Sequence, residues 1–317
     1  MLRWPRAGQA ELIPAEFKTS PVDFLVTESL DFEPTDAGEH LLLCLEKCNL
    51  STPEVARMLA TRFSVPQLDV AYAGMKDKRA ITRQWFSVRG GRDEKIRIGK
   101  LDSAIRVLEI RRHQRKLQRG QIRDNRFEIT LRGIASDAWV AGLERLKGEG
   151  APNYFGPQRF GRDNLNLACA WLPHRRSRRL SKFKQGLYRS VLRSFLFNEV
   201  LAARVTAATW RANIPGEATL HGVPTGPLWG RGRSAAKGDA LAIEEQALAP
   251  HETICLGLEY AGLAQGRRAL VTRPKDMSWE SARSGELRMT FSLPAGNYAT
   301  SLLAEVFELA SPLHAQV

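Results

Sequence analysis

The sequence has few of the patterns that build metal centres, disulfide frameworks or membrane spans. It contains four cysteines and six histidines in 317 residues. No two cysteines form a Cys-x-x-Cys pair and no histidine stands at metal-ligand spacing from a cysteine, so reduced, structural thiols and no metal site are expected. No apolar run approaches the roughly 20 residues that cross a bilayer, and no signal-peptide pattern follows the N-terminus. These absences predict a cytoplasmic protein without membrane contact.

Acidic residues are scarce relative to basic ones. There are 34 Asp and Glu against 47 Lys and Arg, a formal net charge of +13. This excess favours a polyanionic partner, most often nucleic acid or an anionic membrane, over a basic protein that has none. The shortage is greatest over residues 164–198, where no acidic residue occurs. Phosphate contact explains that stretch better than a neutral solvated face, and it marks four arginines as RNA-backbone ligands: Arg175, Arg176, Arg178 and Arg179.

Hydrophobic content of 43% and charged content of 26% are typical of one large or two medium globular domains. Residues 41–47 are expected to form a buried strand, and residues 287–293 have the period-two pattern of another. Thr52 is expected to be the N-cap of a helix that ends before Pro66. Residues 190–204 and 298–309 are also expected to be helical. Turn formers at residues 148–152 mark a domain boundary.

One polar loop lies between the β-prone runs 68–72 and 85–88. It carries a single carboxylate, Asp77, among four cations: Lys76, Lys78, Arg79 and Arg83. Nearby cations favour the ionised form of a carboxylate, which can then act as a nucleophile or a base at neutral pH. On charges alone, a solvated surface turn without chemistry is the more common explanation.

A second basic stretch, residues 111–126, holds seven Lys or Arg and one acid. It runs into a strand-like segment that begins at Asn125 and includes Phe127. Cations bind phosphates, an amide reads a base edge and an aromatic ring stacks on a base, so the combination suits RNA. Phe127 taken alone is more often a core aromatic.

Four motifs together resemble the signature of the TruD family of tRNA pseudouridine synthases. The first is Gly74-Met75-Lys76-Asp77 followed by Ala80, Thr82 and Gln84. The others are residues 153–161 (NYFGPQRFG), residues 291–301 (FSLPAGNYATS) and the opening positions Lys18, Pro21, Asp23, Phe24, Val26 and Glu28. The motifs occur in the family's order, and the resemblance extends along essentially the whole chain.

The resemblance implies an α+β fold. Its pseudouridine-synthase core has a bent, mixed and mainly antiparallel sheet, and an α+β TRUD domain is inserted before the last strand. By this analogy residues 1–149 and 273–317 form the catalytic domain and residues 150–272 the inserted domain. The strand at residues 287–293 would then return to the core sheet. A monomer is expected.

The resemblance also implies a reaction. A uridine in tRNA, usually uridine 13 in the D arm, is isomerised to pseudouridine without cofactor or metal. The N-glycosidic bond breaks, the base turns, and a carbon–carbon bond forms to C5. Asp77 would be the catalytic aspartate, adding to the ring, attacking the sugar at C1′ or removing a sugar proton; the sequence does not choose among these. Lys18 is predicted to pair with it.

Matching positions imply a pocket for a base that leaves its stack. Phe24, Phe127 and Tyr298 would supply aromatic surface, and Asn125 would read the base edge. Close relatives have phenylalanine where this chain has Tyr298, so a buried hydroxyl there would need a partner. Two alternatives stay open: a synthase for a uridine in another RNA, and a tRNA-binding protein or RNA chaperone without turnover. The intact motif around Asp77 argues against the latter.

Overall fold

The computed structural model describes residues 4–91, 96–175, 177, 180–282 and 285–310. The chain divides into two compact units. The sheet unit comprises Ile13–Trp139, Pro274–Gly296 and Phe307–Val317. The helical unit comprises Met1–Leu12, Val140–Arg273 and Asn297–Val306.

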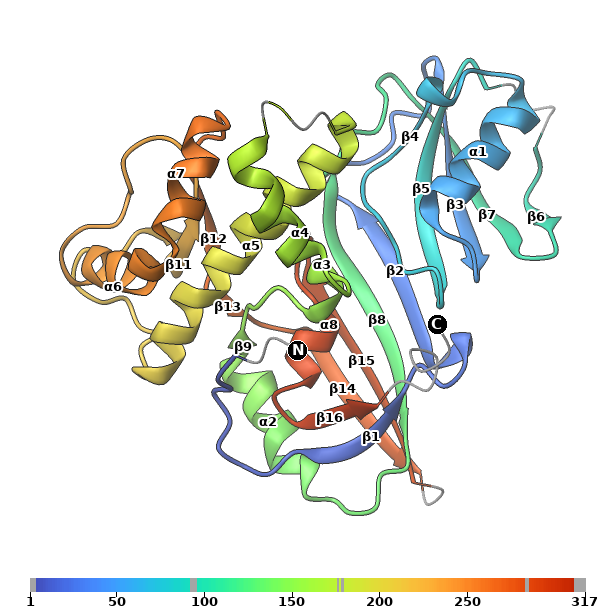
Figure 1. Ribbon diagram of the computed structural model, residues 1–317. Helices are drawn as coiled ribbons and strands as arrows, with labels where there is room; N and C mark the ends of the chain where they lie inside the picture. The colour runs from blue at the N-terminus through green and yellow to red at the C-terminus, as the bar shows by residue number, and fades with distance from the viewer. Residues whose placement is uncertain (1–3, 92–95, 176, 178–179, 283–284, 311–317) are drawn as a thin grey trace. The chain divides into compact units, whose positions relative to one another are not determined.

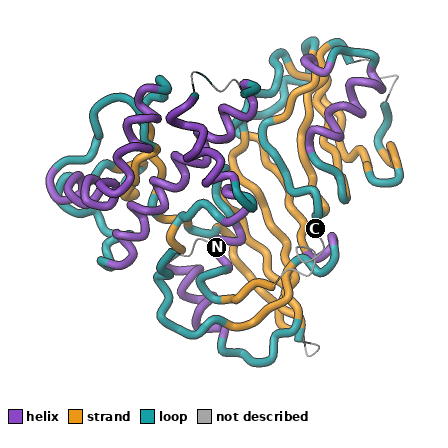
Figure 2. The backbone as a smooth tube through the Cα atoms, viewed as in Figure 1, coloured by secondary structure: helices purple, strands orange, loops and turns teal. Residues whose placement is uncertain are grey.

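The sheet unit is built on an 11-stranded sheet (Figures 1 and 2). Its main path runs β14 (Lys275–Ala282), β15 (Glu286–Pro294), β8 (Ile122–Arg132), β2 (Phe24–Leu30), β5 (Ile81–Arg89), β3 (His40–Cys48), β7 (Ile105–His113) and β6 (Gly99–Asp102). Only the β2–β5 pair on this path is parallel. Off the path, β4 (Val70–Tyr72) pairs with β5, and β1 (Ile13–Phe17) pairs with β8 and, in parallel, with β16 (Phe307–Ala310). The predicted mixed, mainly antiparallel sheet is confirmed.

The predicted buried strand at residues 41–47 lies within β3, and its leucines 41, 42, 43 and 45 are fully buried. Helix α1 (Thr52–Phe63) packs Val55, Leu59 and Phe63 against this part of the sheet. The strand predicted at residues 287–293 is β15, which pairs with β8 and so joins the core sheet as expected.

Two predicted elements need correction. The N-cap of α1 is Ser51 rather than Thr52, because Ser51 and Glu54 form a reciprocal capping box. The helix predicted over residues 298–309 is only the short α8 (Ala299–Leu303). The chain then turns and forms β16, because Phe307 pairs with Ile13 of β1 and tertiary pairing overrides the helical spacing of the apolar residues.

The helical unit packs around α5 (Lys182–Thr206), its longest helix, which includes the helix predicted at residues 190–204. Its other helices are α2 (Trp139–Glu149), α3 (Pro157–Phe160), α4 (Asn164–Trp171), α6 (Gly238–Leu248), α7 (Glu252–Tyr260) and α8. Its strands are β9 (Ala151–Pro152), β10 (Thr219–Leu220), β11 (Val223–Leu228), β12 (Gly266–Ala269) and β13 (Val271–Thr272). β10, β11 and β12 form one small sheet, and β9 pairs with β13. None of the described helices is both long and apolar enough to cross a bilayer.

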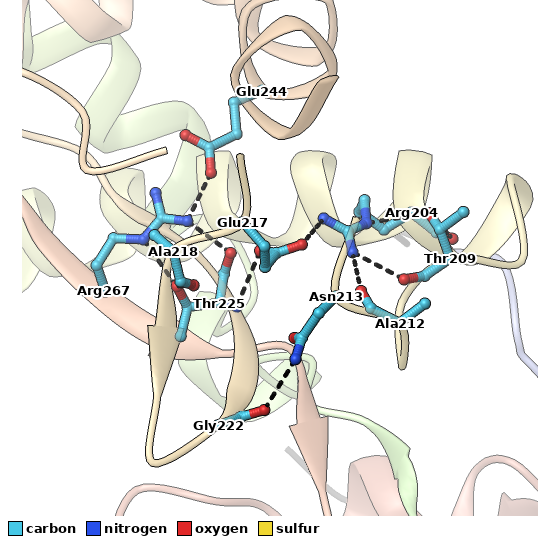
Figure 3. A network of polar contacts seen from close by, with 10 residues as sticks. All are labelled: Arg204, Thr209, Ala212, Asn213, Glu217, Ala218, Gly222, Thr225, Glu244 and Arg267. Carbon is cyan, nitrogen blue, oxygen red and sulfur yellow. Dashed lines mark hydrogen bonds and ion pairs between the residues drawn. The ribbon is translucent and has the colours of Figure 1, made fainter. Parts of the chain in front are cut away.

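Two buried ion pairs connect the end of α5 to β11, β12 and α6 (Figure 3). Arg204 contacts Glu217 at 2.8 Å, and each side chain is 3% exposed. Arg204 also donates to two carbonyls of the turn that follows α5, at 2.8 Å each. Arg267 contacts Glu244 at 2.7 Å and donates to the hydroxyl of Thr225. Thr225 also donates its backbone N–H to Glu217, so one residue links both pairs.

Candidate active site

The loop between β4 and β5 is fixed through its backbone by buried polar side chains. Gln84 Nε2 donates to the Gly74 carbonyl at 2.6 Å. Thr52 Oγ1 accepts from the Lys76 amide at 3.0 Å and donates to Gln84 Oε1 at 2.9 Å. Thr52 and Gln84 are completely buried. The loop is thus anchored to α1 and β5, and it presents Asp77 with 43% of its side chain exposed.

Lys18 contacts the carboxylate directly, as predicted. Its Nζ lies 2.6 Å from Asp77 Oδ2 and 3.8 Å from the centre of the Phe24 ring. Lys18 follows β1 in a left-handed conformation with φ of 56°. This conformation costs a non-glycine residue about 1–2 kcal/mol, and the ion pair and the cation–π contact are favourable interactions that oppose this cost. Strained backbone of this kind clusters at functional sites.

A second lysine, Lys47, lies under the loop. It is 1% exposed and donates to the carbonyls of Leu50 (2.7 Å) and Asp77 (3.1 Å). Burial lowers the pKa of Lys47 to about 8, although the charge of Asp77 opposes this shift. Sequence reasoning placed this residue in an apolar strand without a role. The position of a lysine at the end of a predicted buried strand could have indicated a role, because lysines are rarely buried without a partner.

The cations beside Asp77 in the sequence contact other groups. Lys76 pairs with Glu28 at 2.5 Å, Lys78 with Glu54 at 3.2 Å and Arg83 with Glu46 at 2.8 Å. These three sequence neighbours are therefore not the direct ion-pair partners of Asp77, and their effect on its charge stays a prediction. Side chains of adjacent loop and strand residues diverge, so the direct partner comes from a distant segment, at Lys18.

Lys76 connects the loop to β2 and β8. Besides the Glu28 carboxylate, its Nζ binds Asn125 Oδ1 at 2.8 Å. The Glu28 side chain has no exposed surface, and burial raises its pKa although Lys76 lowers it in part. Glu28 also accepts from the Trp85 amide. This network orients Asn125, so the predicted base reader contacts Lys76, the residue before Asp77 in the loop.

The predicted aromatic residues of the sheet unit lie together. Phe24 and Phe127 have ring centres 6.0 Å apart, and Phe127 stacks on Phe291 at 5.5 Å. Phe24 is 3% and Phe127 7% exposed, so both are part of the packed interior as well as neighbours of Lys18 and Asn125. Phe127 is therefore a core aromatic, the alternative that the sequence analysis named for it. Its stacking on a base stays a prediction.

Tyr298 belongs to the helical unit, where its hydroxyl has the partner that burial requires. Arg159 donates to this oxygen from Nη2 at 2.7 Å and from Nε at 3.2 Å. The ring of Tyr298 meets Phe155 edge-on at 5.9 Å. Arg159 comes from the NYFGPQRFG motif, so the structure brings the second and third sequence motifs into contact.

Of the four predicted RNA-backbone arginines, only Arg175 can be described. It donates to the Leu172 carbonyl at 3.1 Å and lies 5.9 Å from the ring centre of Tyr260. Arg176, Arg178 and Arg179 lie outside the described residues. Among the residues that are described, no group of three or more His, Cys, Asp or Glu is arranged to hold a metal ion.

The loop anchor can be tested at Thr52. Replacing Thr52 by valine keeps the shape but removes the acceptor for the Lys76 amide and the donor to Gln84. Leaving these buried groups unpaired should cost roughly 1–3 kcal/mol of unfolding free energy and displace Asp77. Denaturant unfolding measures the first effect. Thr52→Ser, which keeps the hydroxyl, should restore the loop; equal stability of Thr52→Val and the wild type would refute the anchor.

The arrangement offers one exposed carboxylate beside a lysine, on a rigid loop, near stacked phenylalanines and an oriented amide. A carboxylate in this setting suits covalent or general-base catalysis that needs one charged group.

Comparison with known proteins identifies a family with this chemistry. The family model for tRNA pseudouridine synthase D (TruD) matches residues 8–169.

Relatives match nearly the whole chain. Proteins named tRNA pseudouridine synthase D from Methylococcus capsulatus and Cellvibrio japonicus are 41% and 42% identical, covering 96% and 97% of this chain and 94% of each relative. The fold resembles the crystal structure of a chain named TruD from Methanosarcina mazei, with a TM-score of 0.69, 21% identity and coverage of 98% and 97%. This chain belongs to the TruD family of tRNA pseudouridine synthases.

Proposed function

We propose that this protein isomerises uridine 13 in the D arm of tRNA to pseudouridine, with Asp77 as the catalytic carboxylate. The observation that carries the proposal is the Asp77–Lys18 pair, 2.6 Å apart on an anchored loop, in a chain about as long as its TruD relatives. The net charge of +13 is consistent with a tRNA substrate.

The reaction moves no group in or out. The bond between N1 and C1′ breaks, the base turns, C5 bonds to C1′, C5 loses its proton and N1 gains one. An ionised Asp77 starts this sequence by adding to the ring, attacking C1′ or removing a sugar proton. Lys18 would orient the carboxylate in each case, because its ammonium group lies in direct contact.

The target base must leave its stack to reach the carboxylate. We propose that Phe24, Phe127 and Tyr298 provide its aromatic surroundings and that Asn125 reads its edge. Lys76 occupies Asn125 Oδ1, which supports donation to the base from the amide nitrogen. Arg175, Arg176, Arg178 and Arg179 would meet backbone phosphates.

The assignment of residues 1–149 and 273–317 to a catalytic domain and of residues 150–272 to an inserted domain also stays a proposal. Because the substrate is tRNA, we propose that the protein acts in the cytoplasm, and as a monomer. Sedimentation of the purified chain with and without tRNA would check the oligomeric state.

The function is tested by incubating the purified chain with an unmodified tRNA transcript and mapping pseudouridine along it. We expect conversion at uridine 13 and at no other uridine. No pseudouridine in any tRNA would refute the enzymatic proposal and leave a binding protein or chaperone. Conversion at another position, or only in another RNA, would refute the substrate assignment alone.

Replacing Lys18 by methionine removes the cation that contacts Asp77 but keeps most of the apolar length over Phe24. Turnover should fall by about tenfold, since Lys18 is largely buried but Asp77 is exposed, and a charge-assisted contact in this setting is worth roughly 1–2 kcal/mol. Single-turnover kinetics across pH 5–9 measure it. Lys18→Arg should retain part of the activity; unchanged turnover and an unshifted pH profile in Lys18→Met would remove Lys18 from the mechanism.

A further inference from the structure

One face of α5 lines a cavity to which no role has been given. The cavity has a volume of about 250 Å³, and all of its lining residues belong to the helical unit. Gly186, Arg189, Ser190, Arg193 and Ser194 form its wall on the helix. These positions follow the spacing of a single helical face. Such a face is normally apolar where it meets other elements, but here it consists of two arginines and three small residues.

The opposite wall is apolar. Phe155 precedes α3, Leu228 ends β11, and Leu263 lies in the segment between α7 and β12. Apolar and aromatic side chains of this kind cover the faces of a nucleobase. The volume lies just below the roughly 300–1,000 Å³ of pockets for drug-sized ligands, so it suits one base.

The two arginines have unused hydrogen-bonding capacity. The Nε atoms of Arg189 and Arg193 are buried and have no hydrogen-bond partner in the described part of the chain. Arg193 is held in place by donating to the carbonyls of Leu228 (2.6 Å) and Ala264 (3.0 Å). Ion pairs in the described part of the helical unit use other arginines: Arg145, Arg204, Arg211 and Arg267. Half-buried guanidinium groups that have no carboxylate partner among the described residues favour a phosphate, whose oxygens accept from them.

The cavity adjoins Tyr298. Arg159 donates from Nη1 to Ser190 Oγ in the cavity wall at 3.2 Å and from Nη2 to the Tyr298 hydroxyl at 2.7 Å. Phe155 both lines the cavity and contacts the Tyr298 ring. A single guanidinium group therefore separates the cavity from the predicted stacking residue.

We propose that this cavity binds the nucleotide next to the target uridine in tRNA, with its base against the apolar wall and its phosphate on Arg189 and Arg193. The inference rests on the proposed function, since it takes Tyr298 as a residue that meets the flipped uridine. Enzymes that flip a base also contact its flanking nucleotides, and those contacts select which base enters. The cavity would thus contribute to the choice of uridine.

Gly186 allows the cavity to be filled without crowding the fold. A Cβ built on Gly186 meets no atom within 4 Å, and leucine is a better helix former than glycine. Gly186→Leu should therefore leave the unfolding midpoint unchanged or raise it, while weakening equilibrium binding of unmodified tRNA roughly tenfold. Gly148→Leu is the matched control, because Gly148 lies in α2 with equally open surroundings and outside the cavity.

Arg189→Gln tests the phosphate separately. Its only hydrogen bond among the described residues is a long one to Gln185, at 3.4 Å, so the change should be tolerated. The slope of log affinity against log salt concentration should fall by about 0.7–0.9, the loss of one phosphate contact. Arg211→Gln, which removes an exposed cation elsewhere in the unit, should leave the slope unchanged.

Weaker tRNA binding in both Gly186→Leu and Arg189→Gln, with Gly148→Leu like the wild type, supports the proposal. Normal tRNA binding by Gly186→Leu overturns the proposal, whatever Arg189→Gln does. The leucine fills the cavity, so unchanged affinity would mean that no base of the tRNA occupies it. A free nucleotide as the occupant would also overturn the proposal. In that case a nucleoside monophosphate raises the unfolding midpoint of the wild type but not of Gly186→Leu, and the two proteins bind tRNA with equal affinity. These measurements of binding and unfolding need no turnover. If the wild type binds tRNA but forms no pseudouridine, the proposed function is refuted while the cavity can still be tested.

Discussion

Asp77→Asn should abolish pseudouridine formation while tRNA binding persists. Asparagine keeps the size of the side chain and an oxygen that can accept from Lys18, but an uncharged amide is neither a nucleophile nor a base at neutral pH. We expect turnover to fall by at least about 10⁴-fold, the scale of losing a central catalytic group. Single-turnover conversion of a tRNA transcript, together with equilibrium tRNA binding, measures both quantities.

Asp36→Asn is the matched control for this experiment. Asp36 is exposed and pairs with Arg111 in the same unit, and losing an exposed pair costs about 1 kcal/mol at most. This variant should convert tRNA like the wild type. Conversion by Asp77→Asn within tenfold of the wild type would remove Asp77 from catalysis, whereas loss of both conversion and binding would indicate a folding defect, to be checked with Asp77→Ala.

The second large effect is expected on stability, at the buried pair between Arg204 and Glu217. Arg204→Met leaves the Glu217 carboxylate buried without its cation and two carbonyls without their donor. Breaking a buried pair from one side costs roughly 3–5 kcal/mol. For a chain of this size that lowers the unfolding midpoint by about 10 °C. Thermal unfolding of the full chain, followed by circular dichroism and calorimetry, measures the shift.

Arg211→Met provides the comparison. Arg211 contacts Glu149 at 2.6 Å, a shorter distance than in the buried pair, but both side chains are more than 40% exposed. Solvent screening should reduce the loss to about 1 kcal/mol or less. Equal shifts in the two variants would show that burial does not set the strength of these pairs.

The elements predicted most accurately from the sequence are those with a strong apolar pattern. β3 and β15 were expected as strands and α5 as a helix, because their buried side chains repeat at a fixed period. β16 was missed because residues 302–307 have helical spacing. Only pairing with β1, nearly three hundred residues earlier in the sequence, makes Phe307–Ala310 a strand.

At the candidate site the sequence indicated which residues are present but not how they pair. The family resemblance suggested Lys18 as the partner of Asp77, and the 2.6 Å contact agrees. Charge density around Asp77 suggested its neighbours, and Lys76, Lys78 and Arg83 instead pair with carboxylates of β2, α1 and β3. Such pairings join residues tens of positions apart, so they depend on the register of the sheet rather than on local composition.

The anchoring of the Asp77 loop has a consequence for folding. Lys18 precedes β2, Thr52 begins α1, and Gln84 lies in β5, so three separate segments must assemble before the carboxylate has its surroundings. Contacts of this kind form late, because long chain closures precede them. A partly folded chain would carry Asp77 without its lysine partner and without its rigid loop. Isomerase activity would therefore report on cooperative assembly of the sheet unit, and incompletely folded molecules would leave RNA unmodified.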